Sequence, residues 1–407
     1  MKIKDEIYNN LKNDVGFSKK NAWIGDYPII NATIINPMQG TNFRVSSEYH
    51  QKFDVVWIFE CNIFELIHSW RLLLDESIRL LGDSGILVVR TSDNKFGTLF
   101  GLKSFICRNP NYQVYLEAQY FLDDSTISVL KIKRLNIKSL KSKDWTFGIL
   151  SNGEKNKNII ELISKLESIK RGLRVEYIVA GPEIIELNSK IKIKYIEVAN
   201  DGLARISEKK NKIINEATNE NVVIIHDRYQ VNDDFFSGFD SFGYDFDFMT
   251  VRQLYPSGSE FPSYLAFMAN KKIWESPCRI DSYDQVFEGS FLNGGLIILK
   301  KSTGNLINFN ALLLHNEAED VEIGMQLGVH GIVPRINTIS SAITIGINEE
   351  YTDTFIKSAA KGVGSSEASE NFLKKIILRL WLKLPVVVKN KIKNTYLYEK
   401  AKNLYHS

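Results

Sequence analysis

Three acidic side chains lie close together in the segment AEDVEIG. They are Glu319, Asp320 and Glu322. Carboxylates this close repel one another and raise one another's pKa, which suits a base that removes a proton near neutral pH. Acidic residues are also common at the start of a helix, where they interact favourably with the helix dipole. The segment therefore predicts either a general base or an ordinary helix start.

A second reactive group, His226, Asp227 and Arg228, directly follows the apolar run NVVII. A guanidinium group pairs with phosphate through two hydrogen bonds, so Arg228 suits an anionic ligand. Asp227 or His226 can instead hold a divalent metal ion such as Mg²⁺ or Mn²⁺. The sequence leaves both uses open.

The segments around this group alternate apolar strands with amphipathic helices. The predicted strands cover residues 145–153, 174–182, 192–199 and 221–229, and the predicted helices cover 156–172 and 206–218. Such alternation predicts a mainly parallel α/β sheet. In sheets of this kind ligands bind at the carboxyl ends of the strands, so the site is expected there.

Four segments together resemble the GT-A-fold, family-2-like nucleotide-sugar glycosyltransferases over about residues 145–340. The segments are HDRY (226–229), LARISEKKNKIINEA (203–217), FLNGGLIILKK (291–301) and HNEAEDVEIGMQLGVHG (315–331). The resemblance implies a nucleotide-sugar donor and a saccharide acceptor. It also implies that Asp320 is the base of an inverting displacement, with Glu319 and Glu322 orienting the acceptor or the base.

The same resemblance implies a set of binding residues. On the donor side they are Ser151, Asn152, Gly153, Gly181, Asp201, Lys210, Asn211, His226, Asp227 and Arg228. On the acceptor side they are Asn293, Gly294, Gly295, Glu319 and Glu322. Turn chemistry alone also explains glycine and asparagine at strand ends, and a bulge explains two glycines in a strand. The metal-binding Asp-x-Asp of the family reads His226-Asp227-Arg228 here, which leaves dependence on Mg²⁺ or Mn²⁺ open.

The first 142 residues show an α/β pattern of their own. It consists of the strand 54–61, a helix over 64–81 ended by Gly82 and Gly85, the strand 85–92, and a hairpin of 112–121 and 125–134. This order resembles the carboxyl-terminal half of a class I methyltransferase. No strand followed by GxGxG is predicted before it, so we expect a degenerate domain that binds no S-adenosylmethionine. Methyl transfer to a saccharide and an inactive scaffold of a polysaccharide-assembly complex remain the rival functions.

The end of the chain is strongly basic. From Asn371 onward nine Lys or Arg residues face one acid, Glu399, in a chain whose net charge is +3. Residues 372–384 form a basic amphipathic pattern around Trp381, typical of a helix that lies on an anionic membrane surface. A helix that packs on the rest of the protein is the alternative.

Length and composition limit the class of protein. The 407 residues are 44% hydrophobic and 24% charged, as in soluble globular proteins of two or three domains. The predicted division is a methyltransferase-like domain (1–142), a GT-A domain (143–350) and a linker with the basic tail (351–407). Three separated cysteines and the absence of a secretory signal or bilayer-length apolar run favour the cytoplasm.

The predicted setting follows from the resemblance and the tail together. We expect a peripheral protein on the inner face of the cytoplasmic membrane that acts on a saccharide. Because the tail would place the protein at the membrane, we expect this saccharide to be lipid-linked. Such an enzyme would serve bacterial surface-polysaccharide biosynthesis, as in an O-antigen or a capsule. No nucleic-acid-binding module is recognisable in the sequence.

Overall fold

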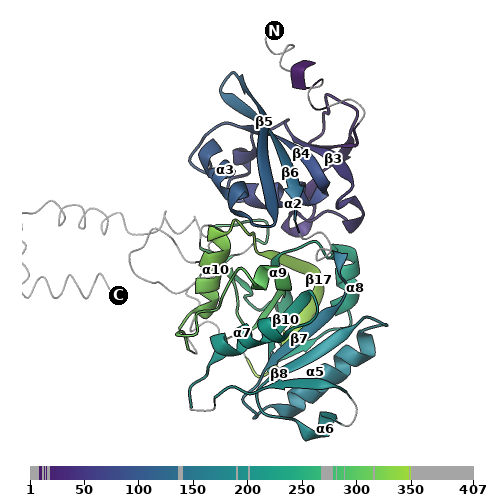
Figure 1. The fold of residues 1–407 in the computed structure, drawn as a ribbon, viewed down its shortest axis with the longest axis vertical. Helices are drawn as coiled ribbons and strands as arrows, with labels where there is room; N and C mark the ends of the chain where they lie inside the picture. Colours follow the sequence, from purple (N-terminus) through teal and green to yellow (C-terminus); the bar gives the residue numbers. More distant parts are fainter. Residues whose placement is uncertain are drawn as a thin grey trace, which may run out of the picture.

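The computed structural model describes residues 9–11, 13, 15, 19–135, 141–188, 191–199, 202–266, 278–280, 282–287, 289–314, 317–347 and 349. Within them the chain forms two α/β bodies, each built on one large sheet (Figure 1). The predicted tail, 351–407, lies outside the described residues. None of the helices in the described ranges is long and apolar enough to cross a bilayer.

Among the described residues of the first body, six strands form the sheet and the helices α2 and α3 pack with it. They are β1 (Asn21–Ile24), β2 (Thr33–Ile35), β3 (Phe53–Ile58), α2 (Trp70–Leu80), β4 (Leu81–Thr91), α3 (Leu99–Arg108), β5 (Tyr112–Leu122) and β6 (Ser125–Arg134). The strand order is β2-β1-β3-β4-β6-β5. Strands β1 to β4 run parallel, and β6 lies antiparallel between β4 and β5. The predicted hairpin is therefore confirmed.

The sequence interpretation of this body missed two strands, and its predicted helix start and helix end are wrong. Strands β1 and β2 precede the first predicted strand, where the sequence pattern indicates none. The predicted helix over 64–81 begins only at Trp70, because Ile67 has a φ of 55° that interrupts the helical backbone. Gly82 and Gly85 do not end the helix but lie inside strand β4.

The second body begins with alternating strands and helices. They are β7 (Trp145–Leu150), α5 (Asn156–Ile169), β8 (Val175–Ala180), α6 (Ile185–Asn188), β9 (Ile193–Ile196), α7 (Ile206–Glu216), β10 (Asn221–His226), β11 (Tyr229–Val231) and α8 (Phe235–Phe242). Then follow β12 (Phe248–Leu254), β13 (Tyr264–Ala266), β14 (Cys278–Arg279), β15 (Ser290–Leu292), β16 (Leu296–Lys300), α9 (Lys301–Gly304), α10 (Glu319–Val329) and β17 (Arg335–Thr344).

The large sheet of this body has the order β11-β17-β12-β16-β10-β7-β8-β9. Strands β10, β7, β8 and β9 run parallel, and β16 lies antiparallel beside β10. The predicted fold class, an α/β architecture with a mainly parallel sheet, is confirmed. Strands β13, β14 and β15 form a separate small sheet.

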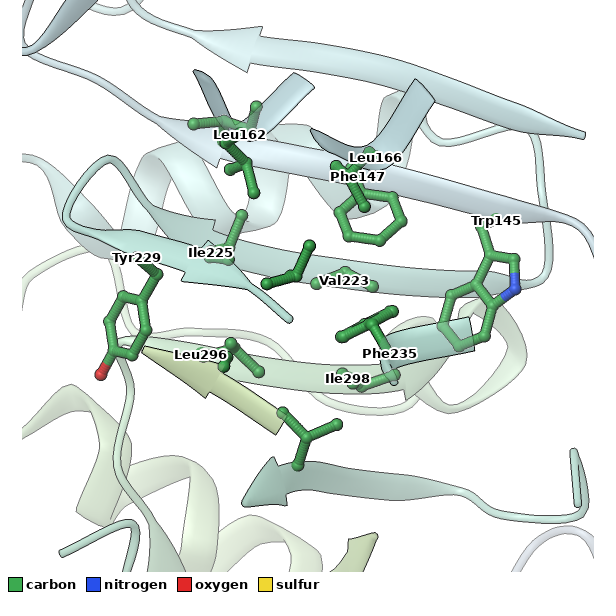
Figure 2. Close-up of a cluster of buried hydrophobic side chains, with 14 of the residues drawn as sticks. Trp145, Phe147, Leu162, Leu166, Val223, Ile225, Tyr229, Phe235, Leu296 and Ile298 are labelled. Carbon is green, nitrogen blue, oxygen red and sulfur yellow. The ribbon is translucent and has the colours of Figure 1, made fainter. Parts of the chain in front are cut away.

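Alternating side chains of the central strands form the core on both faces of this sheet. Phe147 and Val223 point to the face that α5 and α8 cover, where they meet Leu162 and Phe235 (Figure 2). The neighbouring Ile224 points to the other face, which α7 and α10 cover. Burying one such side chain contributes about 1.5–3 kcal/mol, so this two-sided core fixes the strand ends in space.

Buried charged side chains join the two bodies. Arg79 of α2 is 1% exposed and donates hydrogen bonds to Asp245 at 2.6 Å and to Asp247 at 2.9 Å. Arg134 of β6 donates to the second oxygen of Asp245 at 2.9 Å. Burial alone would raise the pKa of Asp245, but Arg134 and Arg79 hold it well below its usual range. Asp245 therefore stays ionised inside the contact between the bodies.

In a second set of ion pairs the arginine belongs to the second body and the acids belong to the first. Arg335 of β17 donates to Asp75 at 3.2 Å and to Glu76 at 2.9 Å, both on α2. Arg44 also donates to Glu76, at 3.3 Å. Because each buried charge has a partner from the other body or from α2, separating the bodies would leave several buried charges unpaired.

Candidate active site

The carboxyl ends of β7 and β10 lie side by side, as the parallel pairing requires. The amide of Asp227 donates to the carbonyl of Leu150 at 3.2 Å, and the amide of His226 donates to the carbonyl of Gly295 at 3.0 Å. The strand-end group is therefore next to the segment that carries the two glycines. The structure brings together two of the four sequence segments that are far apart in the chain.

Asp320 lies beside the same segment, in the first turn of α10. Its Oδ2 accepts a hydrogen bond from the amide of Gly294 at 3.2 Å, and its Oδ1 accepts one from the amide of Val321 at 3.0 Å. Burial and the neighbouring charge of Glu319 raise the pKa of Asp320 to about 6. A carboxyl group with this pKa is poised to accept a proton near neutral pH.

The structure confirms the helix-start interpretation of the acidic segment, and the general base stays a prediction. Glu319, Asp320 and Glu322 all lie in the first turn of α10, as the helix-start alternative requires. Glu322 accepts hydrogen bonds from Gln326 one turn later, at 2.7 and 2.9 Å, and so lies along the helix. Asp320 differs because it turns back to the amide of Gly294.

A buried lysine holds this corner together. Lys210 of α7 is fully buried and donates to the carbonyl of Gly294 at 2.9 Å and to Oε1 of Glu319 at 3.1 Å. Lys210 also opposes the rise in the pKa of Asp320. The side chain therefore positions the acidic segment against the glycines, and its ammonium group is committed to the protein.

The two glycines make room for the protein's own side chains. They lie between β15 and β16 rather than within a strand, which corrects the sequence prediction. A Cβ on Gly294 would be 2.9 Å from both Lys210 Nζ and Glu319 Oε1, and one on Gly295 would be 2.8 Å from the hydroxyl of Tyr229. Internal packing thus explains both positions without a ligand.

The turn after β7 is tightly built. Ser151 is buried, and its hydroxyl accepts a hydrogen bond from the amide of Gly153, which has a φ of +89°. Asn152 accepts in the same way from the amide of Glu154 at 3.1 Å. A Cβ on Gly181, at the end of β8, would be 2.6 Å from the carbonyl oxygen of Ser151. Turn geometry accounts for these residues, and their contact with a nucleotide stays a prediction.

Of the predicted donor residues Asn211 and Asp201, the structure describes only Asn211. The side-chain amide of Asn211 pairs with the backbone of Phe309 in both directions, at 2.7 and 2.9 Å, so it anchors a loop. Asp201 lies outside the described residues. On the acceptor side, Asn293 accepts from the amide of Gly295 at 2.9 Å. Ligand contacts of these residues remain predictions.

Lys209 belongs to the site although the sequence interpretation passed over it. Its ammonium group donates to the carbonyl of Ser151 at 2.6 Å, at the end of β7. Burial lowers the pKa of Lys209, and the charge of Asp227 opposes this effect. Adjacent residues of a helix point in different directions, so Lys209 and Lys210 reach different strands.

The strand end offers few ligands for a metal ion. Within the described ranges, no group of three His, Cys, Asp or Glu side chains lies close enough together to hold one. Asp227 is half-buried and contributes the one carboxylate of the strand-end group. The donor set of these residues therefore does not fit the divalent ion that the family resemblance implies.

In the first body, the loop after β1 is closed by a side chain of the protein. Glu60 accepts hydrogen bonds from the amides of Asp26 and Tyr27 at 2.8 and 2.9 Å and from Trp23 Nε1 at 3.1 Å. A Cβ on Gly25 would be 2.2 Å from Oε2 of Glu60. The amide donors of this loop are therefore committed to an internal carboxylate.

Comparisons with known proteins give a likeness at the level of the fold. No protein-family model and no curated protein sequence matches the chain. A solved structure of GalNAc-T7 with UDP, GalNAc and Mn²⁺ is similar over 54% of this chain and 46% of its own, with 10% identity and a TM-score of 0.38. The chain thus spans about half the length of GalNAc-T7.

Two further structures are similar to a comparable extent. TarS 1-349 of S. aureus is covered to 76% by 60% of this chain, with 13% identity and a TM-score of 0.34. The inositol-1-phosphate CTP transferase of T. maritima is covered to 96% by 53% of this chain, with 9% identity and a TM-score of 0.34. At identities of 13% or less, these likenesses concern the fold alone.

Proposed function

We propose that the second body is a glycosyltransferase of the GT-A type that moves a sugar from a nucleotide-sugar donor to a saccharide acceptor. The observation that supports this proposal is the position and ionisation of Asp320. The pKa of its carboxyl group is raised to about 6, and this group accepts a hydrogen bond from the amide of Gly294. The carbonyl of the next residue, Gly295, accepts a hydrogen bond from the amide of His226. A proton acceptor thus stands beside a strand end suited to an anionic ligand.

The proposed reaction is a single displacement with inversion. Asp320 takes the proton of the acceptor hydroxyl while that oxygen attacks the anomeric carbon of the donor sugar. The bond between this carbon and the diphosphate oxygen breaks on the opposite side, and its electron pair leaves with the nucleoside diphosphate. Lys210 and Glu319 act through Asp320, because they fix the turn that carries it.

The decisive test is Asp320→Asn. The variant should lose about 10²- to 10⁴-fold in kcat, the usual contribution of a general base, while its donor affinity stays within about twofold of the parent protein. Glu317→Gln is the matched control, because this acid is exposed and lies three residues away. Full transfer activity of Asp320→Asn, measured as sugar incorporated into the acceptor, would rule out this role.

Ligand-dependent thermal stability separates the rival functions. Stabilisation by nucleoside diphosphates supports sugar transfer, and stabilisation by S-adenosylhomocysteine supports methyl transfer by the first body. Stabilisation by neither favours a scaffold. A lipid-linked acceptor in bacterial surface-polysaccharide assembly, at the inner face of the membrane, is the setting that the basic tail supports.

A further inference from the structure

Positive charge gathers around Asp227 at the carboxyl edge of the second sheet. Burial raises the pKa of Asp227, and the charges of Lys155, Arg228 and Lys209 act against this rise. Glu154 is the acid that adds to it. We call Lys155, Lys209 and Arg228 the cation cluster. Its three positive charges face two carboxylates, which leaves one charge in excess.

Among the residues that the structure describes, no member of the cation cluster forms a close ion pair. Lys209 donates to the carbonyl of Ser151 at 2.6 Å, an acceptor without charge. The Nε atom of Arg228 is buried and has no hydrogen-bond partner in the part of the chain that the structure describes. Lys155 is exposed at the position just before α5. The cluster therefore keeps donors that an anion can use.

Helix α5 adds to the positive potential at the same point. The side-chain amide of Asn158, in its first turn, donates to the carbonyl of Asp227 at 3.1 Å. No acidic residue lies in that turn. The amino-terminal end of the helix dipole thus adds positive potential beside the cation cluster and Asp227.

A divalent metal ion suits this arrangement poorly. Mg²⁺ and Mn²⁺ are held mainly by carboxylate and other oxygen ligands, and Asp227 is the one carboxylate of the group His226, Asp227 and Arg228. Within the described residues no three His, Cys, Asp or Glu side chains lie close enough together to hold such an ion. The ion would also add two positive charges beside the three of the cation cluster. A diphosphate, in contrast, would bring negative charge to lysine and arginine groups that bind phosphate well.

We propose that the cation cluster of Lys155, Lys209 and Arg228 binds the diphosphate of the nucleotide donor directly, without a bridging metal ion. Asp227 then serves as the counter-ion of the cluster. This inference rests on the proposed function and names how the same site holds its donor. It departs from the metal-dependent chemistry that the family resemblance implies.

Isothermal titration with UDP, GDP, ADP, CDP and dTDP, each in EDTA and in MnCl₂, tests the proposal. For the nucleotide that binds, the Kd in EDTA and the Kd in MnCl₂ should agree within about threefold, which is a difference in binding free energy below about 1 kcal/mol. Binding that requires Mn²⁺ would overturn the inference but leave the proposed function standing. Failure of all five to bind in both buffers would overturn the proposed function and this inference with it.

The Asp227→Asn variant tests the proposal through the direction in which the nucleotide affinity changes. Asp227→Asn removes a negative charge near the diphosphate, so binding in EDTA should tighten, by about fivefold for charges about 6 Å apart in a largely aqueous dielectric. A metal ligand would behave in the opposite way, and loss of binding in this variant would refute the proposal. Thermal unfolding of each variant checks that it is folded.

Loss of a cation should weaken binding. Arg228→Gln should raise the Kd of the nucleotide roughly 10- to 100-fold, as expected for the loss of a charge-assisted hydrogen bond. The Kd of Arg228→Lys should lie between those of the parent protein and of Arg228→Gln. Lys155→Gln should also weaken binding, whereas Lys157→Gln is the matched control. Lys157 lies in the same helical turn, with a side chain that is 89% exposed and 3.9 Å from Glu161. Equal Kd values for the Lys155 and Lys157 variants would contradict the role of Lys155.

Discussion

Glu319→Gln is the perturbation that tests the electrostatics of the proposed base most directly. Glu319 and burial together raise the pKa of Asp320 to about 6, so kcat/KM in the parent protein should fall on the acid side with a midpoint near pH 6. The sign follows from the proposed role. A base works only when ionised, so activity is present above this pKa and is lost as pH falls through it.

The size of the effect follows from the geometry around Gly294. A Cβ at this residue would be 2.9 Å from Glu319 Oε1 and 3.1 Å from Asp320 Cβ, which places the two acids close together. Two unit charges about 6 Å apart interact by about 1.4 kcal/mol at an effective dielectric constant of about 40, which equals one pKa unit. Removing the charge of Glu319 should therefore move the acid midpoint down by about one pH unit.

The loss of Glu319 also leaves the charge of Lys210 without its carboxylate partner at 3.1 Å. Because Lys210 lowers the pKa of Asp320, this change acts in the same direction. The assay is the pH dependence of kcat/KM for sugar transfer, with Glu317→Gln as a control of equal charge change. An acid midpoint that stays in place or rises in Glu319→Gln would refute the reasoning, whatever happens to kcat.

The remaining predictions concern stability and location. Arg79→Met should destabilise the protein by about 3–5 kcal/mol in denaturant unfolding, because Asp245 and Asp247 lose a buried partner. Unchanged stability would show that the contact tolerates unpaired charge. Burial lowers the pKa of Lys300 to about 7. Since the unfolded chain holds this proton up to about pH 10.4, stability should rise between these values by at most roughly 1.4 kcal/mol per pH unit, and Lys300→Met should remove the rise. Deleting residues 371–407 should abolish co-sedimentation with anionic vesicles, and persistent binding would contradict the role of the tail.

Much of the second body could be predicted because its strands and helices carry their pattern locally. The predicted strand 145–153 and helix 206–218 correspond to β7 and α7 with small differences at their ends. The same reasoning missed β1 and β2, which have four and three residues. Strands this short give too few alternating positions for a pattern to stand out. The predicted boundary near residue 142 stays a prediction.

For the candidate site, residue type gave a useful but incomplete guide. The sequence singles out Asp320 and Asp227 as candidates because acids beside an apolar strand or a helix start are conspicuous. Lys209 was missed because it differs from its neighbour Lys210 only in direction, which depends on how α7 packs on the sheet. The pair of glycines suggested a ligand, whereas the space beside them is filled by the protein.

The sequence by itself determined that this chain forms α/β layers built on largely parallel sheets. This was possible because the spacing of apolar residues within a short stretch of chain indicates whether that stretch forms a helix or a strand. Only the tertiary structure decided which charges meet. The packing of helices on the sheets places Gly294 against Asp320, and it brings Arg79 to Asp245 and Asp247, which are 166 and 168 residues away in the sequence. Such pairs depend on distance in space and on burial, which together set the pKa and the strength of each interaction.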